Sequence, residues 1–178
     1  MRIISGTHKG RRLFAPKKLP VRPTTDRSKE GLFNILQHKY DLKNTSVLDL
    51  FSGTGSISYE FGSRGVNNIT AVDQNKTCVD FIRKTSESLK FKIQVTQMDT
   101  KKYLSSVKTQ FDIIFADPPY DLGFQQYTEI IYTVFGNHVL NRLGILIIEH
   151  SDKIEFEQHS WFSQSRRYGS NVFSFFEE

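Results

Sequence analysis

From residue 46 onward, short apolar runs alternate with longer stretches of helical periodicity, and this alternation restricts the fold more than any other feature. Five predicted strands cover residues 46–51, 68–73, 92–99, 111–117 and 144–150. Three predicted helices cover residues 57–65, 76–89 and 124–138. The last two strand segments are almost continuously apolar, as strands buried on both faces are. The pattern predicts an α/β doubly wound fold around a parallel sheet.

The C-terminal sequence departs from this alternation. RRYGSNVFSFFEE predicts an antiparallel strand pair with Gly169 and Ser170 at its turn. This pair brings the predicted sheet to seven strands, mostly parallel.

The N-terminal sequence also differs from the middle of the chain. MRIISG and RRLFAP flank THKG and predict a small β-hairpin that turns at Lys9 and Gly10. RPTTDRSKEGLFNILQHKY then predicts a helix capped by Thr24 or Thr25. We therefore expect a hairpin extension at 1–22 and one α/β domain at 23–178.

Positive charge is concentrated in the first quarter of the chain. Residues 1–43 hold 11 Lys or Arg side chains against 3 acidic ones, whereas the remainder holds 13 basic and 16 acidic side chains. Such a distribution is typical of a polyanion-binding extension on an enzyme, although a basic arm that only aids solubility has the same composition. No apolar run approaches the roughly 20 residues of a membrane span, and no secretory signal is evident, so a cytoplasmic protein is expected.

The first predicted strand ends in the glycine-rich sequence LDLFSGTG, which contains Asp49, Gly53 and Gly55. Glycines at such a turn let the backbone approach a ligand closely. A dinucleotide fingerprint needs a third glycine where this chain has Ser58, and the lysine of a P-loop is absent. Dehydrogenase and nucleotidase functions are therefore disfavoured.

Acidic residues follow the next three predicted strands. Asp73 ends AVD, Asp99 ends MD, and Asp117 opens DPPY. One acid after a strand is often only a helix cap. In this order, and at the edge of the sheet where α/β proteins bind ligands, the acids describe a pocket for an adenosine without a pyrophosphate. The cofactor that fits this pocket is S-adenosylmethionine.

VLDLFSGTG, AVD and DPPY together resemble the class I S-adenosylmethionine-dependent methyltransferases that modify exocyclic amines of nucleic-acid bases. MRIISGTHKGRRL and RPTTDRSKEGLFNIL narrow this resemblance to the bacterial 16S ribosomal RNA guanine(966)-N2-methyltransferase family, along essentially the whole chain. The resemblance implies a Rossmann-like fold and, as the partner, small-subunit ribosomal RNA within a subunit particle. We expect the protein to be a monomer. Asp73 stands where this family more often has Glu, and Ser52 where many members have Ala.

The resemblance also implies site residues. Asp49, Gly53 and Gly55 would line the methionine portion of the cofactor, Asp73 its ribose, and Met98 with Asp99 its adenine. The full set of implied cofactor contacts is Arg22, Thr24, Thr25, Asp49, Phe51, Gly53, Gly55, Asp73, Met98, Asp99 and Asp117. The expected RNA contacts are Lys9, Arg11, Arg12, Arg22 and Arg27.

DPPY suits methylation of an amine whose lone pair is delocalised into a base. The Asp117 carboxylate and the Pro118 carbonyl can each accept one N–H and so localise the lone pair on nitrogen. Pro119 fixes the turn, and Tyr120 offers a stacking face worth about 1 to 3 kcal/mol. The base must be unpaired or flipped out. These four residues are the predicted catalytic set, and neither a metal nor a covalent nucleophile is needed.

Two other functions share these motifs. A DNA adenine-N6 or cytosine-N4 methyltransferase would need a target-recognition insertion that the sequence lacks, and a non-enzymatic RNA-binding protein could have kept the fold. Glu149 ends the last parallel strand and is open to a structural or a functional role. Cys78, the only cysteine, is expected to be a half-buried structural thiol.

Overall fold

Seven strands form one sheet in this computed structural model, which describes residues 1–16, 24–119 and 122–178. The strands are β1 (Ser46–Leu50), β2 (Asn68–Asp73), β3 (Ile93–Gln97), β4 (Phe111–Ala116), β5 (Leu140–Ser151), β6 (Phe162–Tyr168) and β7 (Asn171–Phe176). Their order in the sheet is β3-β2-β1-β4-β5-β7-β6. The first five strands in this order are parallel, and β7 runs antiparallel to both β5 and β6. The predicted mostly parallel sheet with a C-terminal antiparallel pair is confirmed.

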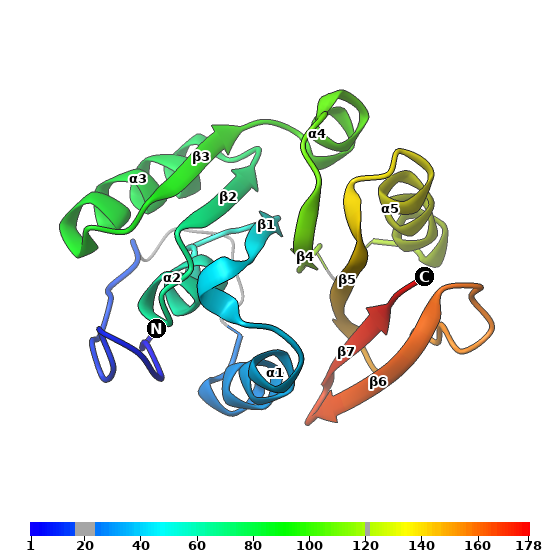
Figure 1. Cartoon of the computed structure of the whole chain (residues 1–178), viewed down its shortest axis with the longest axis horizontal. Helices are drawn as coiled ribbons and strands as arrows, with labels where there is room; N and C mark the ends of the chain where they lie inside the picture. The colour runs from blue at the N-terminus through cyan, green and yellow to red at the C-terminus, as the bar shows by residue number, and fades with distance from the viewer. Residues whose placement is uncertain (17–23, 120–121) are drawn as a thin grey trace.

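Helices cover both faces of this sheet (Figure 1). They are α1 (Asp26–Lys39), α2 (Ser56–Ser63), α3 (Lys76–Leu89), α4 (Thr100–Ser106) and α5 (Phe124–Gly136), with a short 3-10 helix at Leu42–Asn44. Phe33 of α1 and Phe61 of α2 pack with Val47, and α3 lies beside α2. Ile131 of α5 packs with Leu48, which points to the opposite face. The fold is therefore doubly wound, as predicted.

Helix α1 begins where the sequence predicts it. Of the two candidate caps, Thr25 is the one used, and its hydroxyl oxygen accepts the Ser28 N–H. Leu32, Phe33 and Leu36 are fully buried against the sheet, because their spacing places them on one face of the helix. This packing fixes the start of α1, and with it Thr24, relative to the strand ends.

The structure differs from the predicted elements in several places, among them the start of β6 at Phe162 rather than within RRY. Helix α4 lies between β3 and β4, where no helix was predicted, and of its seven residues only Thr100 and Leu104 are buried. Strand β5 begins at Leu140, before the predicted start. The N-terminal hairpin is present in reduced form, as an isolated antiparallel bridge between Arg2 and Arg12. Among the described residues, no helix is long and apolar enough to cross a membrane.

Candidate active site

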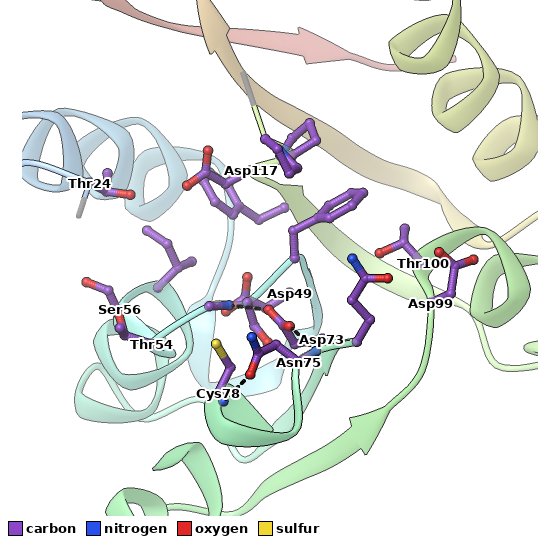
Figure 2. A pocket seen from close by; sticks show the side chains of 18 residues that line it. Thr24, Asp49, Thr54, Ser56, Asp73, Asn75, Cys78, Asp99, Thr100 and Asp117 are labelled. Carbon is purple, nitrogen blue, oxygen red and sulfur yellow. Dashed lines mark hydrogen bonds between the residues drawn. The ribbon is translucent and has the colours of Figure 1, made fainter. Parts of the chain in front are cut away.

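A cavity of about 480 Å³ lies at the carboxyl ends of β1, β2, β3 and β4 (Figure 2). The strand order reverses between β1 and β4, so this is the position where open α/β sheets bind ligands. Its described lining is Thr24, Asp49, Phe51, Ser52, Gly53, Thr54, Ser56, Ile57, Asp73, Gln74, Asn75, Cys78, Asp99, Thr100, Phe115, Asp117, Pro118 and Pro119. The volume falls within the range of roughly 300 to 1,000 Å³ that is usual for ligand pockets.

The glycine-rich loop after β1 is held in place by Asp73. One carboxylate oxygen of Asp73 accepts the Gly53 N–H at 2.8 Å, and the other accepts the Asn75 N–H at 2.8 Å. Gly55 adopts φ +77° as the N-cap of α2, and a Cβ there would lie 2.8 Å from the Tyr59 ring. Phe51 also has a positive φ, of 56°, which is unusual for a bulky residue. The ribose contact of Asp73 stays a prediction, and its observed role is to shape the loop.

Asp49 is buried behind this loop. The N–H and hydroxyl of Ser58 both donate to one Asp49 carboxylate oxygen, at 3.1 and 2.6 Å. Burial raises the pKa of Asp49 to about 7; the Ser58 hydrogen bonds oppose this shift and the charge of Asp73 adds to it. Ser58, which stands where a dinucleotide fingerprint has glycine, therefore holds an acid of the cavity wall.

The raised pKa of Asp49 predicts how stability depends on pH. A group that titrates at a higher pH in the folded chain stabilises it fully below the unfolded pKa, and this contribution disappears as the pH rises through the folded pKa. Because the pKa of an aspartate side chain is ordinarily 3.8 and that of Asp49 in the folded chain is about 7, the window runs from about pH 4 to pH 7. We expect the stability of the wild type relative to Asp49→Asn to fall by about 4 kcal/mol across it.

The measurement is urea unfolding of both proteins, without added ligand, at a series of pH values. Asp152→Asn serves as the control, because Asp152 is an exposed acid in an ion pair with Arg167. Parallel pH profiles for the wild type and Asp49→Asn would contradict the raised pKa.

Asp99 lines the cavity on the side where the sequence predicts the adenine, and it also caps α4. Its carboxylate accepts the Lys102 N–H at 3.1 Å, and Thr100 lines the cavity next to it. Met98, which was expected beside Asp99, is 37% exposed and is not part of the cavity lining. Gly55 and Thr25, the N-caps of α2 and α1, are not part of the lining either. Arg22 lies outside the described residues.

The acceptor side of the cavity is formed by the loop after β4. The Asp117 N–H donates to the Leu50 carbonyl at 3.4 Å, which joins the end of β4 to that of β1. Asp117, Pro118 and Pro119 line the cavity, and the Pro119 carbonyl accepts the Leu122 N–H at 3.0 Å. Tyr120 lies outside the described residues, so its stacking role stays a prediction.

Several lining residues were not predicted from the sequence. Thr54, Ser56, Gln74, Asn75 and Thr100 follow the predicted acids and glycines by one or two positions, and that adjacency was the available signal. Within the described part of the chain, the Ser56 hydroxyl oxygen is buried without a hydrogen-bond partner. A buried polar atom of this kind is suited to a polar ligand.

Cys78 was expected to be half-buried, but it is 1% exposed and lines the cavity from α3. Burial raises the pKa of its thiol to about 11, so the thiol is protonated at neutral pH. It therefore contributes a small apolar surface to the wall. Among the described residues, no three His, Cys, Asp or Glu side chains group as metal ligands.

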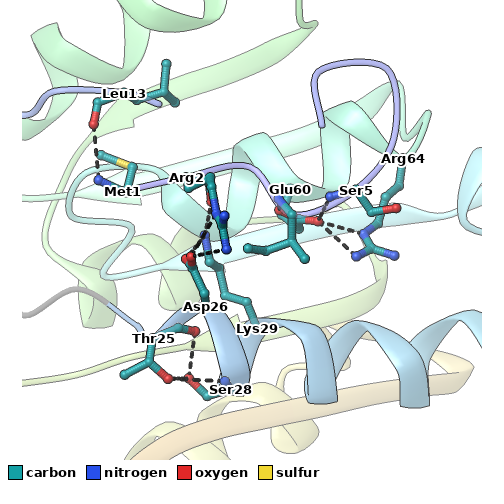
Figure 3. Close-up of polar contacts among 11 residues, drawn as sticks. Met1, Arg2, Ser5, Leu13, Thr25, Asp26, Ser28, Lys29, Glu60 and Arg64 are labelled. Atoms are coloured by element: carbon teal, nitrogen blue, oxygen red, sulfur yellow. Dashed lines mark hydrogen bonds and ion pairs between the residues drawn. The ribbon is translucent and has the colours of Figure 1, made fainter. Parts of the chain in front are cut away.

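The basic N-terminal segment is anchored to α2 (Figure 3). Glu60 is fully buried and accepts the N–H groups of Ile4 and Ser5 at 2.8 and 3.0 Å. Arg64, one turn later, lies 2.9 Å from the same carboxylate. Gly6 has φ +82°, and a Cβ there would lie 1.8 Å from the Ser63 carbonyl oxygen. Ile4 and Ser5 therefore donate to α2, whereas the Ile3 N–H still donates across the short hairpin, to the Arg11 carbonyl.

The segment also contacts α1. The ammonium group of the buried Lys29 donates to the Arg2 carbonyl at 2.5 Å, and Arg2 pairs with Asp26 at 2.9 Å. Burial lowers the pKa of Lys29. The predicted RNA contacts Lys9, Arg11, Arg12 and Arg27 are all exposed. The division at residue 22 stays a prediction, although the described part of the extension is packed against the main domain.

The chain is similar along most of its length to bacterial proteins named as methyltransferases. "Ribosomal RNA small subunit methyltransferase D" of Haemophilus influenzae is 29% identical over 167 residues, which cover 90% of this chain and 84% of that protein. A structure of the Escherichia coli protein yhhF has a TM-score of 0.86 at 26% identity, covering 100% of this chain and 97% of that one.

A more distant structure shares the fold. It is the T. thermophilus 16S rRNA N2 G1207 methyltransferase (RsmC) in complex with AdoMet and guanosine. Its TM-score is 0.71 at 19% identity, and the match covers 90% of this chain and 45% of that one. The model of the family described as "Conserved hypothetical protein 95" matches residues 1–177. The chain therefore belongs to that family, as the resemblance of its motifs to the small-subunit ribosomal RNA methyltransferases predicts.

Proposed function

We propose that this protein transfers a methyl group from S-adenosylmethionine to the exocyclic N2 of a guanine in small-subunit ribosomal RNA, at position 966. The observation that carries the proposal is one cavity whose wall joins the acidic ends of β1 to β3 with the Asp117-Pro118-Pro119 loop. Methylation of small-subunit ribosomal RNA is supported by the name of the Haemophilus relative. The N2 atom and the position rest on the resemblance of the sequence motifs.

S-adenosylmethionine is the cofactor of this family's chemistry, and the cavity fits it. When bound, it supplies an electrophilic methyl group. Asp73 is suited to hold the ribose hydroxyls, and Asp99 with Thr100 the adenine. The loop of Gly53 and the Ser56 hydroxyl, which lacks a partner among the described residues, are suited to the amino-acid portion. These assignments are part of the proposal.

The acceptor loop would prepare the nitrogen for methylation. The guanine N2 is a weak nucleophile because its lone pair is shared with the ring. The Asp117 carboxylate and Pro118 carbonyl would each accept one N–H, which favours a tetrahedral nitrogen with its lone pair directed at the methyl carbon. As the N–C bond forms, the bond between the methyl carbon and the sulfonium sulfur would break, and the nitrogen would give up one proton, which the Asp117 carboxylate would accept. Most of the acceleration would come from orienting the two reactants in line.

The proposal is tested by methyl transfer to small-subunit particles and to naked 16S RNA, both prepared from cells that lack this protein. We expect one modified guanine, located by mass mapping at position 966. Duplex DNA serves as the competing substrate, to test the alternative of a DNA methyltransferase. Such an enzyme would need a long target-recognition insertion, but the longest described connection after α1 is residues 152–161, between β5 and β6. Methylation of DNA alone, or no transfer despite measurable cofactor binding, would overturn the proposal.

The exposed arginines of the N-terminal segment lead to a separate prediction. Each phosphate contact that is lost lowers the slope of log affinity against log salt by about 0.7 to 0.9. We expect the double variant Arg11→Gln/Arg12→Gln to flatten this slope by the amount that corresponds to about two lost phosphate contacts. Its affinity for the cofactor should be unaffected. The measurement is a fluorescence titration of RNA at several salt concentrations.

A matched control removes two positive charges elsewhere. Lys108 and Arg142 are exposed and lie at the amino ends of β4 and β5, the edge of the sheet opposite the cavity. Lys108→Gln with Arg142→Gln should leave the salt slope unchanged. Equal slopes for the wild type and the Arg11/Arg12 variant would show that the N-terminal segment does not contact RNA.

A further inference from the structure

Glu149 is a buried carboxylate that connects strand β7 with Thr24 in the wall of the cavity. It lies near the carboxyl end of β5 and is 2% exposed. One carboxylate oxygen accepts the side-chain N–H of Asn171, the first residue of β7, at 2.6 Å. The other accepts the hydroxyl of Thr24 at 3.2 Å. Residues from three distant parts of the chain thus meet at one carboxylate.

Thr24 lines the cavity next to the start of α1. In Figure 2 it lies on the same side of the cavity as Asp117, and Asp73, Asn75 and Cys78 lie on the other side. Only 8% of Thr24 is exposed, and its hydroxyl donates to Glu149. The wall at this point is therefore positioned by a side chain from outside the cavity lining.

A buried carboxylate is costly unless it is well hydrogen-bonded, which makes its donors informative. The donor on β7 is fixed by the sheet, because Ser151 pairs with Asn171 in the antiparallel register. Asn171 therefore orients Glu149, and Glu149 in turn orients Thr24. Since β5 also pairs with β4, whose end carries Asp117, one strand supports both Thr24 and the Asp117 loop on this side of the cavity.

On this basis we propose that Glu149 is a positioning residue for the cofactor site. It acts through Thr24, whose hydroxyl it holds, and it sets the affinity for the cofactor without contacting the reacting atoms. The inference rests on the proposed function, because it assigns Thr24 to the wall that meets S-adenosylmethionine.

The test is a double-mutant cycle on the dissociation constant of S-adenosylmethionine, measured by calorimetry. Glu149→Met keeps the approximate side-chain length but removes both acceptors, and Thr24→Val removes the hydroxyl. We expect each change to weaken binding roughly tenfold. The double variant should bind the cofactor with the same affinity as the weaker-binding single variant, because both changes remove the same contact. Glu149→Gln, which keeps one acceptor oxygen, should have an intermediate effect.

Kinetics separates positioning from a loss of structure. With small-subunit particles, the KM for the cofactor should rise in Glu149→Met, whereas kcat at saturating cofactor should stay close to the wild-type value because the Asp117 loop is intact. Thr45→Val is the matched control. Thr45 is also 8% exposed, but its hydroxyl donates to the Leu42 carbonyl at 2.9 Å, remote from the cavity lining. This variant should lower stability and leave cofactor affinity unchanged.

The outcomes are distinguishable. Multiplicative losses in the double variant, or wild-type affinity in Glu149→Gln and Thr24→Val, would overturn the inference. If Glu149→Met does not fold, the cycle is run with Glu149→Gln and the same criteria. A wild-type protein that binds no S-adenosylmethionine would instead overturn the proposed function.

Discussion

Asp117→Ala is expected to slow methyl transfer by about 10² to 10⁴-fold, the usual contribution of a positioned proton acceptor. The physical reason is the loss of the carboxylate that would accept an amine N–H and then its proton. Asp117 lies at the acceptor side of the cavity, after β4. The measurement is single-turnover transfer of a labelled methyl group to small-subunit particles.

Calorimetry with S-adenosylmethionine provides the control, because the cofactor should still bind to Asp117→Ala. Asp152→Asn, which removes a partly exposed carboxylate paired with Arg167, should transfer methyl groups at the wild-type rate. Unchanged turnover in Asp117→Ala would exclude Asp117 as the proton acceptor. Loss of turnover together with loss of cofactor binding would place Asp117 in the cofactor site instead.

Glu60→Ala is expected to lower the free energy of unfolding by about 3 to 5 kcal/mol, the usual cost of removing one partner of a buried ion pair. The fully buried Glu60 holds Arg64 at 2.9 Å and the N–H groups of Ile4 and Ser5. The substitution leaves the Arg64 side chain, which is only 7% exposed, without this carboxylate. The measurement is urea unfolding followed by the fluorescence of Trp161, the single tryptophan.

An exposed ion pair with the same spacing provides the control. Lys76 and Asp80 on α3 are four residues apart, like Glu60 and Arg64, but their side chains are 73% and 50% exposed. Asp80→Ala should cost less than about 1 kcal/mol. Similar losses in the two variants would show that the buried carboxylate does not anchor the N-terminal segment. Proteolysis of residues 1–13 in Glu60→Ala would report directly on their release.

The parallel strands could be predicted because each contains an apolar run, or in β3 alternating apolar residues, bounded by polar residues or glycine. β2 was predicted with its observed bounds, as was α3, whose apolar residues recur on one face. Helix α4 was missed because seven residues with a single buried apolar side chain, Leu104, carry too little periodicity. Elements with a strong repeating pattern are therefore predictable, and short ones that rely on neighbours for stability are not.

The site was predictable only in part. Parallel strands end at the same edge of a sheet, so Asp49, Asp73, Asp99 and Asp117 were expected together and do line one cavity. The hydrogen-bond partners of these acids were not predictable. Ser58 reaches Asp49 only because tertiary packing brings the start of α2 against β1. The same holds for Glu149, whose contact with Thr24 joins residues 125 positions apart.

The attachment of the basic segment to α2 has a consequence for the order of events during synthesis. Ile4 emerges from the ribosome 56 residues ahead of Glu60, which accepts its N–H. At about 5 to 20 residues per second, this interval lasts roughly 3 to 11 seconds. Throughout it, the segment lacks its anchor on α2, although its partners on α1, Asp26 and Lys29, are made earlier. The segment can therefore reach its final position only after Glu60 has been made, and it is exposed to the translating ribosome's own RNA until then.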